Sequence, residues 1–73
     1  MFFVIELQKN GSQVGNIVTA HQTQMEAESK YHTVLAAAAL STIDAHSAIL
    51  LNEDATPMLY QCYRHGSAEE PFT

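Results

Sequence analysis

Apolar and polar positions near the start of the chain follow the pattern of a β-hairpin. Residues 2–8 are rich in aromatic and β-branched side chains, and residues 13–19 return with a similar character. An Asn-Gly dipeptide at 10–11 separates them and favours a two-residue turn, because both central residues of such a turn need positive φ. The pattern predicts that Lys9 pairs with Ser12 and that both faces of the hairpin are partly apolar.

The next segment carries the signals of a helix. Thr23 followed by Glu26 is a capping box, which marks a helix start. Residues 24–40 contain no Gly or Pro and include four successive alanines, the best helix formers. Apolar residues recur at three- and four-residue steps and predict the face that packs on the core: Ala27, Tyr31, Val34, Leu35 and Ala38.

A second strand pair follows the helix. Residues 45–51 and 58–64 have strand character, and the polar stretch 52–57 between them predicts a turn. The order ββαββ predicts an α+β fold with a four-stranded, mainly antiparallel sheet and one helix packed on one face. Residues 1–65 are expected to form a single domain, and residues 66–73 a flexible C-terminal tail.

A chain of 73 residues can build only one small core. A domain of this size buries about 60% of the surface that its unfolded form exposes, so most such domains need a further stabilising device. Cys62 is the only cysteine, which excludes an intrachain disulfide and fits a reducing compartment. We interpret it as a small apolar residue within a strand.

Because a disulfide is excluded, the pattern indicates that self-association stabilises this small domain. One helix can cover only one face of the sheet, so the other face is expected to stay apolar and to mark an interface. A twofold homodimer is the simplest assembly, and edge-to-edge extension of the sheet is the alternative. The residues expected on the uncovered face, and therefore in the interface, are Phe2, Val4, Ile17, Tyr60 and Tyr63.

The charge balance argues against nucleic acid as a partner. Three cations, Lys9, Lys30 and Arg64, stand against eight acidic residues and give a net charge of −5. Scattered cations cannot build the basic surface that binds nucleic acid. The apolar run at residues 1–5 is too short for a signal peptide or a membrane span, so we expect no membrane contact and a cytoplasmic location.

Candidate chemistry is sparse. Glu28 and His32 lie four residues apart on the predicted helix, a spacing that can offer two ligands to one metal ion, but no third ligand lies at a telling distance. A metal site would require His21 or His46 to converge on them. The serines lack a nucleophile-elbow context, and the carboxylates form no natural acid–base pair. We therefore expect no cofactor and no enzymatic activity.

The stretch 28–39, together with residues 3–6 and 16–19, looks like small uncharacterised proteins encoded in phage and prophage genomes of gut bacteria. This resemblance covers roughly residues 2–52. It implies a phage-related origin and assigns no role to any residue.

Three functions fit these observations. The first is a non-catalytic, homo-oligomeric interaction or structural module. The second is an acidic inhibitor that binds a host protein, which the net charge permits. The third is a metal- or small-ligand-binding domain that uses the histidines with Glu28.

Overall fold

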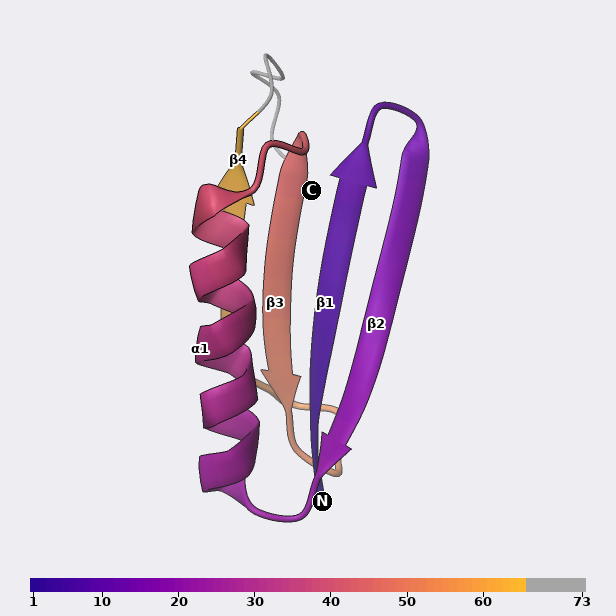
Figure 1. Cartoon of the computed structure of the whole chain (residues 1–73). Helices are drawn as coiled ribbons and strands as arrows, with labels where there is room; N and C mark the ends of the chain where they lie inside the picture. The colour runs from indigo at the N-terminus through magenta and orange to yellow at the C-terminus, as the bar shows by residue number, and fades with distance from the viewer. Residues whose placement is uncertain (66–73) are drawn as a thin grey trace.

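The computed structural model describes residues 1–65 and confirms an α+β fold of order ββαββ (Figure 1). The predicted tail, 66–73, lies outside the described residues. Five elements make up the fold: β1 (Phe2–Asn10), β2 (Gln13–His21), α1 (Gln24–Leu40), β3 (Ala45–Leu51) and β4 (Pro57–Arg64).

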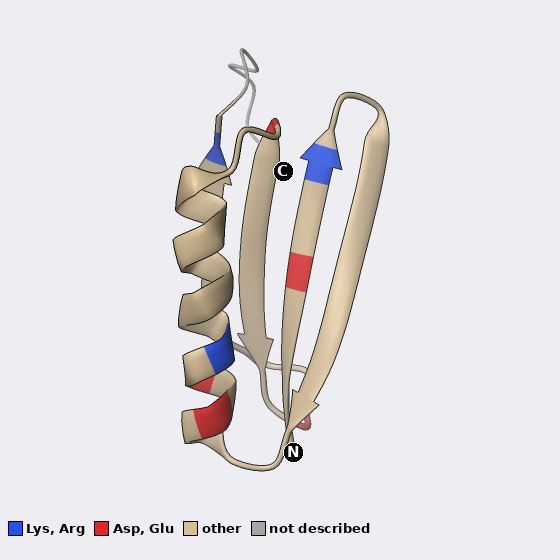
Figure 2. Cartoon of the chain, in the orientation of Figure 1, with Lys and Arg blue, Asp and Glu red and all other residues tan. Residues whose placement is uncertain are grey.

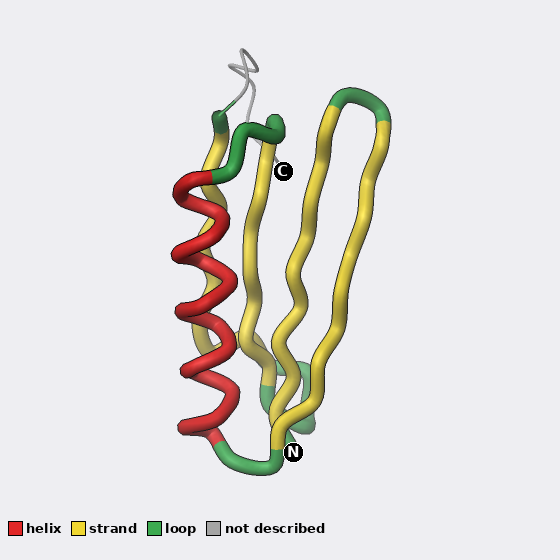
Figure 3. Tube along the Cα trace, viewed as in Figure 1, coloured by secondary structure: helices red, strands yellow, loops and turns green. Residues whose placement is uncertain are grey.

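All four strands form one antiparallel sheet in the order β2-β1-β3-β4. The first strand of each hairpin is therefore central, and β2 and β4 are the edges. The helix lies along one face of the sheet and contacts β3 most extensively, while the turns gather at the two ends of the molecule (Figure 3).

The first hairpin turns one residue later than predicted. Gly11 and Ser12 form the loop and Asn10 pairs with Gln13, so the predicted pairing of Lys9 with Ser12 is wrong. Gly11 alone in this turn has a positive φ, 66°. A turn with positive φ only at its first central residue follows the type II′ pattern, which favours glycine there. Pairing partners shift by two residues, an even number, so every side chain keeps its predicted face.

The helix begins where its capping box predicts. Thr23 Oγ1 accepts a hydrogen bond from the backbone N–H of Glu26 at 3.2 Å, which satisfies one of the free donors of the first turn. At the other end, the N–H of Ser41 donates to the carbonyl of Ala38. Across residues 1–65, no helix is long and apolar enough to cross a membrane.

The core lies between α1 and the two central strands. Val4 and Leu50 face each other across β1 and β3 and are the largest fully buried side chains. The predicted helix face is confirmed: Ala27, Tyr31, Val34 and Ala38 are buried, and Leu35 is partly buried. Each large apolar side chain buried in this way contributes about 1.5–3 kcal/mol to folding.

Most of the residues predicted to lie opposite the helix lie on the same face of the sheet as the helix. Phe2 and Val4 pack with the core, and Ile17 and Tyr63 share their face by strand alternation. Tyr60 alone has the predicted position. The prediction was wrong for the other four because alternation sorts side chains into two faces without saying which face the helix covers.

The path of the chain decides which face is covered. β2 and β3 both run antiparallel to β1, so they are parallel to each other, and α1 connects them as a crossover. Crossovers between parallel strands of one sheet are right-handed in about 98% of cases. The connection through α1 has this hand (Figure 1). The helix is thereby placed over the face that carries Val4 and Leu50.

Candidate functional site

The face of the sheet opposite the helix, here called the open face, is rich in apolar side chains. No element among residues 1–65 packs on it. The two central strands contribute large apolar side chains to it at alternate positions: Phe3, Ile5 and Leu7 from β1, and Ile49 and Leu51 from β3.

One line of apolar side chains, here called the apolar row, crosses the open face from edge to edge. Ile5 pairs with Val18 on one side and with Ile49 on the other, and Ile49 pairs with Tyr60. Every strand of the sheet thus contributes one member. Val18 and Tyr60 are 56% and 74% exposed. Cross-strand neighbours of this kind form a continuous surface rather than scattered apolar residues.

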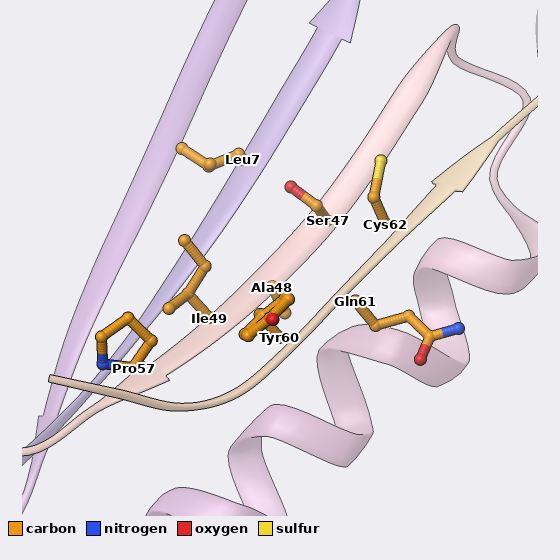
Figure 4. Close-up of a pocket in the computed structure, with 8 residues that line it drawn as sticks. All are labelled: Leu7, Ser47, Ala48, Ile49, Pro57, Tyr60, Gln61 and Cys62. Atoms are coloured by element: carbon orange, nitrogen blue, oxygen red, sulfur yellow. The ribbon is translucent and has the colours of Figure 1, made fainter. Parts of the chain in front are cut away.

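A shallow hollow of about 590 Å³ lies over the β3–β4 part of the apolar row and extends over the small side chains of Ser47 and Cys62 (Figure 4). Leu7 stands on one side of it and Tyr60 on another (Figure 4). Its lining is mostly apolar and consists of Leu7, Ser47, Ala48, Ile49, Pro57, Tyr60, Gln61 and Cys62. Such a hollow can receive a bulky apolar group.

Both ends of the open face carry charges of both signs, since Asp44 accepts a hydrogen bond from Gly11 N–H at the Lys9 end and the amino terminus pairs with Glu53 at the other. Lys9 and Arg64 flank Ala45 in register at one end, and the loop after β3 carries Glu53 and Asp54 at the other (Figure 2). Glu53 also accepts a hydrogen bond from the amino terminus, which lowers the pKa of its carboxyl. By strand alternation, no charged side chain of the described strands lies between these ends on the open face.

A second cluster lies on the helix side. His46 Nε2 is 2.5 Å from Glu6 Oε2, and Gln8 Nε2 donates to the same oxygen at 3.0 Å. Burial raises the pKa of Glu6, but the hydrogen bonds from His46 and Gln8 and the positive charges of His46 and Lys30 outweigh it, so the pKa lies below its usual value.

This cluster is largely buried. The side chains of His46 and Glu6 are only 7% and 15% exposed. His46 Nδ1 is buried without a hydrogen-bond partner among the described atoms. Cys62, the one thiol, lies on the opposite face of the sheet and cannot use His46 as its base. The arrangement therefore lacks a nucleophile.

The candidate metal ligands are dispersed. Glu28 accepts a hydrogen bond from Gln24, and the ring of His32 lies edge-on to Tyr31. His21 contacts Thr19. Within the part of the chain that the structure describes, no three His, Cys, Asp or Glu side chains come together as metal ligands.

The two edges of the sheet differ in protection. β4 begins with Pro57, has an irregular register beside Leu51 and ends with Arg64, all of which hinder the pairing of a further strand. β2 has no charged residue and no proline, and its Ile17 is 52% exposed. Edge pairing is therefore more accessible at β2.

Comparisons with known proteins found no matching family model, no matching curated protein and no matching solved structure. The function must therefore be argued from the open face itself.

Proposed function

We propose that this protein is a non-catalytic interaction module that forms a homo-oligomer, in its simplest form a twofold dimer, by burying the open face. One observation carries the proposal: the apolar row spans all four strands of a face that no described element covers. Contiguous apolar surface of this kind marks interaction sites in soluble proteins. A twofold dimer is the commonest assembly that buries such a surface.

The layer structure supports the same function. A sheet with two apolar faces needs a packing layer on each face, and α1 forms such a layer on only one of them. A second sheet packed face to face at about 10 Å would supply the other. Each square ångström of apolar surface removed from water contributes about 25 cal/mol. Assembly would thus also stabilise a domain whose own core is small.

Edge pairing through β2 is the alternative contact. The absence of charge on β2 favours it, but this contact would leave the apolar row in water. The functions of acidic inhibitor and of metal- or small-ligand-binding domain stay predictions, as do the phage-related origin and the cytoplasmic location.

A lysine in the centre of the apolar row tests the proposal. Ile49→Lys should raise the dissociation constant of the dimer by more than about 100-fold, because an unpaired charge would be buried. Sedimentation velocity over a concentration series measures the constant, and circular dichroism checks that the variant folds. Leu40→Lys is the matched control. Leu40 is 85% exposed at the end of α1, so the expected change is below about twofold.

Two results would contradict the proposal. One is a wild-type chain that stays monomeric far above micromolar concentration. The other is loss of association in Ile17→Lys, at the β2 edge, together with unchanged association in Ile49→Lys. That pair of results would assign the contact to the edge.

A further inference from the structure

The outer edge of β2 is a regular strand edge that nothing in residues 1–65 occupies (Figure 1). On its inner side β2 pairs with β1 in one continuous register from Gln13 to His21. Most of its residues are exposed and none is buried. An inference from this edge goes beyond the proposed function, because it depends on backbone groups of β2 and not on the side chains of the open face.

The hairpin register fixes which backbone groups of β2 point outward. A two-residue hairpin loop closes on a hydrogen-bonded pair, and Asn10 and Gln13 form that pair. Hydrogen-bonded and non-hydrogen-bonded pairs then alternate along the antiparallel ladder. The N–H and C=O groups of the odd residues of β2 therefore face β1. The even residues, here called the outward residues, direct both groups away from β1: Val14, Asn16, Val18 and Ala20.

A second copy of β2 can satisfy every one of these outward groups. In antiparallel pairing about a twofold axis at Ile17, Asn16 pairs with Val18 of the other copy, and Val14 pairs with Ala20 of the other copy. All N–H and C=O groups of the outward residues then have partners, because these residues lie symmetrically about Ile17. A twofold axis at any other residue of β2 leaves some of them unpaired.

The side chains of β2 are compatible with this register. Ile17 is 52% exposed and would meet its own counterpart in a non-hydrogen-bonded pair, where side chains lie closest. No like charges would oppose each other, because β2 has no Asp, Glu, Lys or Arg.

The helices leave room for the contact. Each α1 contacts β3 most extensively, and the two β3 strands would lie five strand spacings apart, or about 24 Å. A helix with its side chains is about 10–12 Å across, so the two helices would not collide.

The difference between the two sheet edges favours a second copy as the occupant. β4 has Pro57, an irregular register beside Leu51, and Arg64, which hinder further pairing, whereas β2 has no proline, charge or register shift. Pairing of two β2 edges would bury both unprotected edges and leave a protected β4 at each end. The assembly would therefore close at two copies and would not grow into a fibre.

We infer that the β2 edges of two copies of this chain pair antiparallel about a twofold axis at Ile17. The two four-stranded sheets become one continuous sheet of eight strands, with both helices on the same side. The open faces lie side by side on the other side of this sheet and stay available for the contact proposed above.

Hydrogen exchange tests the register at single residues. The amides of the outward residues should exchange rapidly in dilute protein, and their exchange should slow by more than about tenfold as the concentration rises through the range of association. The amide of Ile17 faces Glu6 of β1 and is the internal control, because it should be protected at every concentration. Outward amides that stay unprotected while the chain associates would overturn the inference and leave the proposed function standing.

A proline at an outward residue gives an independent test. Asn16→Pro removes an N–H that the fold does not use, and edge strands tolerate proline at such positions. It should raise the dissociation constant of the edge contact by about tenfold or more, because the twofold symmetry removes two hydrogen bonds. Asn16→Thr keeps the N–H and is the matched control, with an expected change below about threefold.

Both variants are measured by sedimentation in the Ile49→Lys background, which isolates the edge contact from the open face. Circular dichroism checks that each variant folds, and the exchange measurement decides if Asn16→Pro does not. Equal association of Asn16→Pro and Asn16→Thr would overturn the inference. Protected outward amides in a chain whose association Ile49→Lys does not alter would support the inference and contradict the proposed function.

Discussion

The two faces of this sheet differ in apolar character: the face without a helix is more apolar than the face that the helix covers, which is the reverse of the usual arrangement. The face beneath α1 contains Val4 and Leu50 but also a carboxylate, Glu6, and an imidazole, His46. The face without a helix is apolar through its middle, along the apolar row. In a monomer the more apolar face would be expected inside. This difference is the basis of the proposal that a second layer covers the open face.

The carboxylate of Glu6 is tolerated beneath the helix because it is paired. Glu6 accepts one hydrogen bond from Gln8 and lies against His46, so hydrogen-bond partners within the protein replace the water that the carboxylate loses on burial. The open face has no comparable arrangement, since apolar side chains cannot be satisfied by hydrogen bonds. Only removal from water stabilises them, and that requires another layer.

The largest expected loss of stability comes from a substitution on β3, where neighbouring residues lie on opposite faces of the sheet. Leu50→Ala, beneath the helix, should lower the free energy of unfolding by about 2–5 kcal/mol at every protein concentration, because it opens a cavity in the core. Chemical denaturation monitored by circular dichroism measures the loss.

Ile49→Ala is the matched comparison, one residue away and on the open face. Its cost should grow with protein concentration, because the part of Ile49 that stays exposed in one chain would be buried by the proposed assembly. If both variants lose the same free energy of unfolding at every protein concentration, the two faces do not differ in the way proposed.

An intermediate effect concerns the polar cluster. The pKa of Glu6 in the folded state lies below its ordinary value of 4.5, so its stabilisation is complete above about pH 4.5 and is lost as the pH falls through the lower folded-state value. Glu6→Gln should cost about 1.5–3 kcal/mol at neutral pH through the weakened contact with His46. It should also flatten the loss of stability in acid.

Denaturation midpoints between pH 3 and pH 7 test this prediction. Glu28→Gln is the control, because it removes the same charge from the helix and should leave the acid-dependent loss in place. An unaltered acid profile in Glu6→Gln would show that the helix side owes its stability to apolar packing alone.

The smallest effect lies outside both faces. Thr23→Ala removes the hydroxyl that accepts from Glu26 and should lower stability by about 1 kcal/mol. The dissociation constant of folded chains, measured by sedimentation well below the melting temperature, should not change. A weakened dimer in this variant would indicate that association depends on overall stability and not on the open face.

Much of the local structure could be predicted from residue order. The cap at Thr23, the buried helix face and the two hairpins depend on contacts between residues close in the sequence. The turn was misplaced by one residue, because Asn10 and Gly11 resemble a type I′ turn while the chain uses Gly11 and Ser12. Four of the residues predicted for the uncovered face lie on the helix side for a different reason, since both faces of the first hairpin are apolar.

The sequence of β1 does carry a signal for the more apolar face. Along β1 the odd positions 3, 5 and 7 are all apolar, whereas the even positions become polar at Glu6 and Gln8. This difference marks the odd set as the more apolar face, although it cannot tell whether a helix or another chain covers it. The partner of Glu6, His46, is 40 residues away and could not be predicted from local pattern.

The sequence by itself determined the five elements, the helix face that packs and the two sets of side chains that alternate along each strand, because these depend on backbone propensity and periodicity. The tertiary structure alone decided the strand order, the pairing of Glu6 with His46 and the face that stays open. The physical reason is that alternation is symmetric between the two faces of a sheet. The right-handed connection from β2 through α1 to β3 removes that symmetry.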